Sequence, residues 1–135
     1  MKHILLSFLI CPFFFIACSS NDEDCNVAEP EETRYYVRYE LKTKAQYTNQ
    51  SSTLRIATEK GIEEQRFHGG NSWEATYGPV KKGFKTSISC SMSGGDSRWT
   101  NIHARIYVSR EKEPFVLKAE GNDGADLSLS YTIDF

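Results

Sequence analysis

Residues 84–92 read FKTSISCSM, and a side chain suited to a protein core stands at every second position. The positions on this side are Phe84, Thr86, Ile88, Cys90 and Met92. The positions between them are a lysine and three serines. A two-residue period of this kind is typical of a β-strand that has one face in a core and the other in water.

The same period recurs through the chain from residue 35. The segments that show it are 35–41, 54–58, 62–67, 73–77, 84–92, 102–108, 115–119 and 127–135. The charged 62–67 segment is expected at a sheet edge, Gly78-Pro79 is expected to end the 73–77 strand, and Phe135 is expected in the core. No window of helical length carries an apolar stripe. Seven or eight short strands predict an antiparallel β-sandwich, immunoglobulin-like in architecture only, and a small β-barrel is the alternative.

Residues 1–17 have the composition of a signal peptide. Lys2 and His3 precede an apolar run that is shorter than the ~20 residues of a bilayer-crossing helix. The sequence Phe15-Ile16-Ala17-Cys18 resembles the lipobox of bacterial lipoproteins, although Phe15 replaces the usual Leu. This resemblance implies that Cys18 carries lipid and that the chain is cut before it. An ordinary secretory signal followed by an incidental cysteine is the alternative.

Residues 18–33 form a predicted tether. From Cys18 to Glu32 there are six acidic residues and no Lys or Arg. The run Ser19–Asp24 resembles the export signal that sends lipoproteins of the Bacteroidetes to the cell surface, across the outer membrane. A periplasm-facing anchor is the alternative localisation. Residues 34–135 form one domain, and the 15 basic and 12 acidic residues from Thr33 onward are too nearly balanced to indicate nucleic-acid binding.

Two of the four cysteines are left to explain, because Cys11 belongs to the signal and Cys18 to the lipid anchor. A disulfide between Cys25 and Cys90 is a candidate in an oxidising compartment. It would close a loop of about 65 residues and stabilise the fold by roughly 4 kcal/mol. The alternative is that Cys90, on the apolar face of its strand, is a small buried residue with a free thiol.

Several strand patterns are similar to those of a known group of proteins. The segments YYVRYEL at 35–41, IHARIYV at 102–108 and LSYTI at 129–133, with Trp73 before a lysine-glycine turn, resemble small Bacteroidetes cell-envelope lipoproteins of uncharacterised function. They are also weakly similar to the β-sandwich of small accessory subunits of actinobacterial lipid exporters. The resemblance implies the fold and an envelope location, and it implies no activity.

The sequence indicates no catalytic or metal-binding chemistry. His68 and His103 have no metal ligand at zinc spacing, and the acidic segment 120–126 is expected to be a hairpin turn and not a calcium loop. There is no GxSxG elbow, P-loop or CxxC pair. We therefore expect no cofactor and no enzyme, and a secreted hydrolase remains the less favoured class.

The expected function is binding, through a lipid anchor to the membrane and through loops to a protein or glycan partner. Trp99 and Arg98 lie in a Gly- and Ser-rich loop, and Tyr36 and Tyr107 point away from the apolar faces of their strands, so these four are candidate partner contacts. They could instead be structural, and Trp73 is expected in the core. The basic cluster Lys81, Lys82 and Lys85 is expected to be a solvated turn or a contact for anionic groups. The alternative function is a structural accessory subunit of an envelope transport or assembly complex.

Overall fold

The structure is a computed structural model that describes residues 32–94 and 98–135. The expected signal peptide, the expected lipidation site Cys18 and the candidate disulfide partner Cys25 lie outside these residues. Within them, no helix is long and apolar enough to cross a bilayer.

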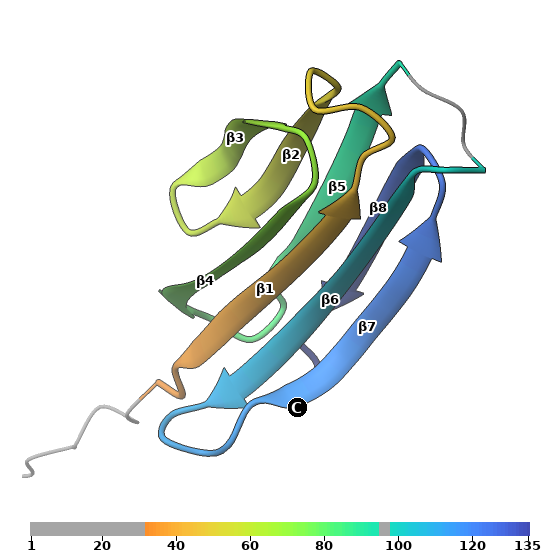
Figure 1. The fold of residues 1–135 in the computed structure, drawn as a ribbon. Helices are drawn as coiled ribbons and strands as arrows, with labels where there is room; N and C mark the ends of the chain where they lie inside the picture. The colour runs from red at the N-terminus through yellow and green to blue at the C-terminus, as the bar shows by residue number, and fades with distance from the viewer. Residues whose placement is uncertain (1–31, 95–97) are drawn as a thin grey trace, which may run out of the picture.

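The described chain forms eight strands (Figure 1). They are β1 (Tyr35–Lys44), β2 (Ser51–Thr58), β3 (Gly61–His68), β4 (Asn71–Val80), β5 (Lys85–Ser93), β6 (Asn101–Arg110), β7 (Val116–Asp123) and β8 (Asp126–Thr132). Sheet A has the order β4-β1-β6-β7, sheet B has the order β3-β2-β5-β8, and all neighbouring strands are antiparallel. The predicted all-β sandwich is confirmed, and in the described residues no ladder joins the two sheets into a barrel.

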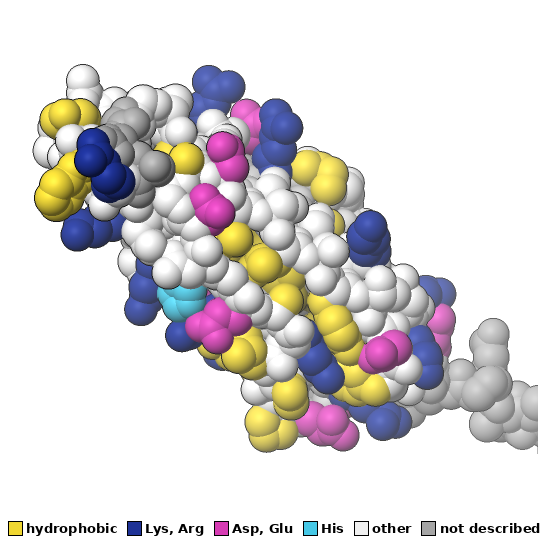
Figure 2. Space-filling view, turned by 90° about the vertical axis from the view of Figure 1, so that its right-hand side faces the viewer, with side chains coloured by type: hydrophobic (Ala, Val, Ile, Leu, Met, Phe, Trp, Pro, Cys, Tyr) yellow, Lys and Arg dark blue, Asp and Glu magenta, His cyan; other side chains and the backbone are white. Residues whose placement is uncertain are grey.

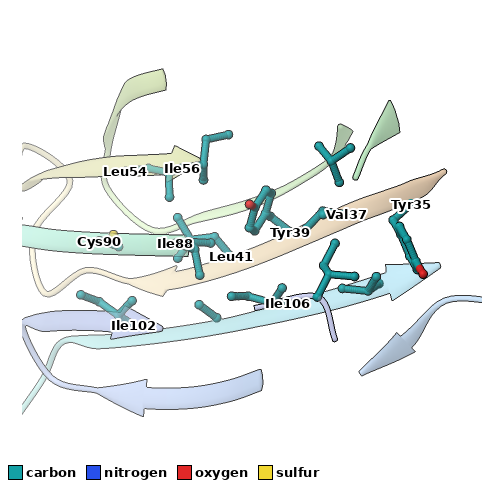
Figure 3. Packing of buried hydrophobic residues seen from close by; sticks show 14 of the residues in the cluster. Tyr35, Val37, Tyr39, Leu41, Leu54, Ile56, Ile88, Cys90, Ile102 and Ile106 are labelled. Carbon is teal, nitrogen blue, oxygen red and sulfur yellow. The ribbon is translucent and has the colours of Figure 1, made fainter. Parts of the chain in front are cut away.

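The core lies between the two sheets, where every second side chain of each central strand is buried (Figure 3). In β5 the predicted alternation holds, since Thr86, Ile88, Cys90 and Met92 are all buried. Tyr39 is fully buried in β1, and its hydroxyl donates to the carbonyl of Ala57 at 2.6 Å. That bond satisfies a polar group that would otherwise be costly inside a core. Each large apolar side chain buried here contributes about 1.5–3 kcal/mol of transfer free energy.

The strand connections differ from those of antibody domains. The first two strands of an antibody domain pair within one sheet, whereas β1 and β2 lie in different sheets. The connections β3–β4 and β7–β8 also pass from one sheet to the other (Figure 1). Within the segment 120–126 only residues 124–125 lie between strands, and they connect β7 and β8 in different sheets, so the prediction of a hairpin turn was wrong. The Asp123 carboxylate accepts from the main-chain N–H groups of Ala125 and Asp126 at 3.1 and 3.4 Å, which shapes this turn.

The sequence predicts that the fourth strand ends at Gly78-Pro79, but β4 runs past this pair. It continues to Val80, which is buried, and β1 accommodates the extension with a register shift between Tyr35 and Val37. Gly78 has a φ of +130°, and a Cβ at this position would lie 2.8 Å from the main-chain oxygen of Tyr35. A glycine lets the two backbones approach this closely. Gly78, which the sequence pattern marks as the end of the strand, therefore permits the pairing of β4 with β1.

Two apolar residues predicted in the core are more exposed than expected. In the β6–β7 ladder, Ile106 pairs with Ala119 and Tyr107 pairs with Leu117, so one extra residue of β7 lies between the two pairs. This bulge turns Leu117 to the outside, where it is 44% exposed. Phe135 is 36% exposed because β8 ends at Thr132 and the chain beyond leaves the interior. Its ring packs edge-on against that of Tyr35 at 5.6 Å.

The side of the sandwich formed by the edge strands β7 and β8 is incompletely closed. Figure 2 shows a line of hydrophobic side chains along this side. The inward-facing residues of β8, which are Leu127, Leu129 and Tyr131, pack against the core but are only partly buried. No third layer and no further strand covers them in the described part of the chain.

The strand directions define two ends of the molecule. The chain enters at residues 32–34, and this proximal end also holds the turns 59–60 and 81–84, the loop 111–115 and residues 133–135. The opposite, distal end holds the loops 45–50, 69–70 and 124–125 and the described parts of the β5–β6 loop, Gly94 and residues 98–100. The ten residues of β1 separate the two ends by about 33 Å at ~3.3 Å per residue.

Candidate functional site

The distal loops are connected to one another by hydrogen bonds of two buried residues, Gln50 and Thr100. Gln50 is 5% exposed, and its side-chain nitrogen donates to the carbonyl of Gly94. Its main-chain oxygen accepts from Gly69 N at 2.8 Å, and its Oε1 accepts from Gln46 N at 3.0 Å. The hydroxyl of the buried Thr100 donates to the carbonyl of Gly124. These bonds connect all four distal segments, so the end of the sandwich has a fixed backbone.

Two exposed aromatic rings stand on this fixed backbone. Trp99 is 60% exposed and Tyr47 is 56% exposed, and Arg98 beside Trp99 is exposed as well. Trp99 and Arg98 are sequence-predicted contacts, and the structure places both at the distal end. Tyr47 was missed, because it lies in the polar run QYTNQ, residues 46–50, and no strand pattern marks it. Its loop also lines a hollow of about 330 Å³, together with His68 and the Gly69-Gly70 turn.

The other two predicted contacts lie elsewhere, on the outer face of sheet A. Tyr36 pairs in register with Ser109, and Tyr107 pairs with Arg38. Both rings are half-buried and belong to the proximal halves of β1 and β6. The structure therefore divides the four predicted residues into a distal pair, Arg98 and Trp99, and a lateral pair, Tyr36 and Tyr107.

A row of charged side chains crosses the outer face of sheet A from edge to edge. The in-register row is Glu74 in β4, Glu40 in β1, Arg105 in β6 and Glu120 in β7. Arg105 Nε donates to Glu120 Oε1 at 2.7 Å, and its Nη1 lies 3.7 Å from Glu40 Oε2. The bond from Arg105, followed by the contact with His103 Nε2 at 2.8 Å, holds the pKa of the Glu120 carboxyl below its usual value.

Arg38 separates the two like charges of this row. Glu40 and Glu74 stand directly opposite each other, an arrangement that destabilises a sheet unless a cation intervenes. The Arg38 guanidinium lies 3.6 Å from Glu40 and 3.9 Å from Glu74. It is also stacked on the rings of Tyr107 and Phe115, with its central carbon 4.5 and 4.9 Å from their centroids. Tyr107 is thus partly structural, because it holds this cation in place.

The outer face of sheet B carries a shallow polar hollow of about 440 Å³. Arg55 and Arg66 stand on one side of it and Asp126 on the other, with serines of β5 and β8 between them. Glu64 forms ion pairs with both arginines, since its Oε2 accepts from Arg55 Nε at 2.9 Å and its Oε1 lies 3.5 Å from Arg66. The hydrogen bond from Arg55 is the main reason that the pKa of Glu64 is lowered.

Groups with chemical reactivity are dispersed over the described residues. No set of three or more His, Cys, Asp or Glu side chains is arranged to hold a metal in residues 32–94 and 98–135. His68 is at the distal end of β3, whereas His103 lies on sheet A beside Glu120. Cys90 is a free thiol that is 3% exposed, and burial followed by the charge of Asp126 raises its pKa to about 11. A raised pKa makes a thiol a poorer nucleophile.

The basic cluster predicted around the lysine-glycine turn lies at the proximal end. Lys81 Nζ forms an ion pair with Glu32 at 2.8 Å, where the chain enters the sandwich. Arg34 N donates to Glu111 Oε1 at 2.7 Å, and Glu111 N donates back to Arg34 O at 2.9 Å. The entry point of the chain is thereby fixed to the turn 81–84 and to the loop 111–115.

Comparison of the chain with protein-family models, with curated proteins and with solved structures gave no match.

Proposed function

We propose that this chain is a lipid-anchored interaction module of the bacterial outer membrane, whose distal loops bind a protein or glycan partner at the cell surface. The observation that carries the proposal is that the chain entry and the exposed aromatic rings lie at opposite ends of the sandwich. The chain enters at Glu32–Arg34, and Trp99 and Tyr47 are exposed about 33 Å away along β1. With lipid on Cys18, this arrangement directs the rings away from the membrane.

The side chains at the distal end suit recognition better than they suit stability. Exposed Trp, Tyr and Arg are the residue types that carry the most energy in protein interfaces, and aromatic rings also pack on sugars. Neither Trp99 nor Tyr47 contributes much to the core at 60% and 56% exposure. The bonds made by Gln50 hold the loops in place before binding, which reduces the ordering cost of association.

The proposal is tested by affinity capture from native membranes with the chain anchored. A variant with Trp99→Ala and Tyr47→Ala should lose the captured partner while keeping its unfolding midpoint. Ile62→Ala is the matched control, because Ile62 is a large apolar side chain, 68% exposed, on the edge strand β3. Equal recovery of the partner by the double variant and by the control would refute a distal site.

A structural accessory subunit of an envelope complex is the second candidate, and a lateral patch favours it. Leu117 is 44% exposed on the edge strand β7 and pairs in register with Tyr107, whose ring stacks on Arg38 together with that of Phe115. Such a patch suits lateral contact with another subunit. Under this alternative, Leu117→Ser would abolish co-purification with the membrane partner, and Trp99→Ala would leave it intact.

A further inference from the structure

The positive charge of the body is concentrated at the proximal end. The cations in its turns and strand ends are Arg34, Lys60, Lys81, Lys82, Lys85, Arg110, Lys112 and Lys118. The acids among them are Glu32, Glu59, Glu111, Glu113 and Asp134. The end therefore carries a net charge of +3 with Glu32 included. The other seven basic and eight acidic residues from Thr33 onward sum to −1.

Apolar surface accompanies this charge. Phe135 and Val116 are 36% and 53% exposed at this end. Lys118 Nζ lies 3.8 Å from the centroid of the Phe135 ring, so a cation and an apolar surface share one site. Lysines beside exposed aromatic and branched side chains are the composition that favours a membrane interface, where the cations meet phosphates and the rings enter the headgroup region.

We propose that the proximal end docks on the anionic lipid headgroups of the membrane that holds the anchor. This inference rests on the proposed lipid at Cys18. Fourteen residues, 18–31, separate the lipidated residue from Glu32, and they can span at most about 50 Å. The basic end is thus restricted to the neighbourhood of the bilayer, and the anchor supplies the effective concentration that a +3 patch needs.

Docking fixes the orientation of the molecule. A bilayer against residues 81–85 and 111–118 places β1 roughly upright, and the distal rings then stand about 33 Å above the headgroups. Each lysine near an anionic surface contributes about fivefold to the docking equilibrium, the equivalent of ~1 kcal/mol. Removing three lysines should therefore weaken docking by about 100-fold, and salt should weaken it further because the charges are exposed.

The test uses the lipidated full chain in vesicles that contain a brominated lipid as a fluorescence quencher. One set of vesicles is phosphatidylcholine alone, and the other includes 30% phosphatidylglycerol. Phe135→Trp places a reporter at the proximal end, and the parent chain, with Trp99 at the distal end, is the reference. We expect the added tryptophan to be quenched in anionic vesicles, to lose this quenching in 1 M salt, and to be unquenched in neutral vesicles.

Two triple variants of the reporter chain distinguish an effect of the proximal lysines from an effect of the overall charge of the protein. K81Q/K82Q/K85Q should abolish the quenching, and K42Q/K44Q/R66Q, which removes the same charge from exposed sites away from this end, should retain it. The proposal is overturned if the quenching is absent, if it is equal in both lipids, or if the two variants reduce it equally. Failure of the chain to sediment with neutral vesicles refutes the lipid anchor instead, and docking is then decided by sedimentation with the anionic vesicles alone.

Discussion

Ile133→Ala should destabilise the protein strongly, although Ile133 lies after the last strand and two residues before Phe135. Ile133 is 1% exposed in the core between the sheets. Its N–H donates to Phe84 O at 3.1 Å and its carbonyl accepts from Gly83 N at 2.8 Å, so the backbone is held against the β4–β5 turn. The side chain closes the proximal end of the core.

The size of the effect follows from the atoms that are removed. Three carbons at ~0.8 kcal/mol each give a loss of about 2.4 kcal/mol in transfer free energy. A residual cavity of roughly 50 Å³ adds about 1 kcal/mol at ~24 cal/mol per Å³. The total is about 3–4 kcal/mol, which corresponds to a fall in Tm of roughly 12–16 °C for a domain of this size.

Equilibrium unfolding in urea, followed by tryptophan emission, measures this difference. Ile62→Ala is the matched control, because the same atoms are removed from a side chain that is 68% exposed. It should change the free energy of unfolding by less than about 1 kcal/mol. Equal stabilities for the two alanine variants would show that residues 133–135 are a tail and that the core ends at Thr132.

Three further predictions concern single side chains. Because the folded pKa of the Cys90 thiol is about 11 and its ordinary value is 9.0, the folded state retains this proton more tightly. The resulting stability is full below pH 9 and falls by about 2–3 kcal/mol as the pH rises to 11. Cys90→Val should remove this part of the pH dependence and keep the part that arises from the raised pKa values of Tyr39, Tyr77 and Tyr131. Trp99→Ala should change the free energy of unfolding by no more than about 0.5 kcal/mol, and the lost emission should be that of a solvated indole, whereas a loss of several kcal/mol would make the ring structural. Cys18→Ala should abolish palmitate labelling and release the protein from membranes, and label retained by this variant would refute the lipoprotein hypothesis.

The sandwich could be predicted because alternation is a local property. The apolar face of β5 and that of β6 follow from the two-residue period alone, and their buried residues match the prediction. Strand order could not be predicted, because pairing depends on contacts between segments far apart in the chain. The bulge opposite Ile106 and Tyr107 could not be predicted either, because one extra residue in β7 changes which side chains face the core without changing the composition of the strand.

The candidate site could be predicted from the sequence only in part, because some of its contacts join segments far apart in the chain. Trp99 and Arg98 were found because a large ring in a Gly- and Ser-rich loop has no strand face to bury it. Tyr47 lies in a loop with no such contrast, and its place at the same end depends on the hydrogen bonds of Gln50, which a sequence pattern cannot show. Tyr107 was predicted as a contact, yet its role in stacking Arg38 is visible only when β1 and β6 are paired.

The separation of the two ends makes the two proposals independently testable in one set of variants. The distal rings and the proximal lysines lie about 33 Å apart along β1, several times the ~8–10 Å Debye length of physiological salt. Charge changes at Lys81, Lys82 and Lys85 should therefore leave the intrinsic affinity of the distal loops unchanged. Partner capture by anchored chains should fall only through lost orientation, to the level that the parent chain shows in neutral vesicles, where the proximal end does not dock. Loss of capture in solution and on vesicles alike would show that the partner also contacts the proximal end, and the two surfaces would then be one site.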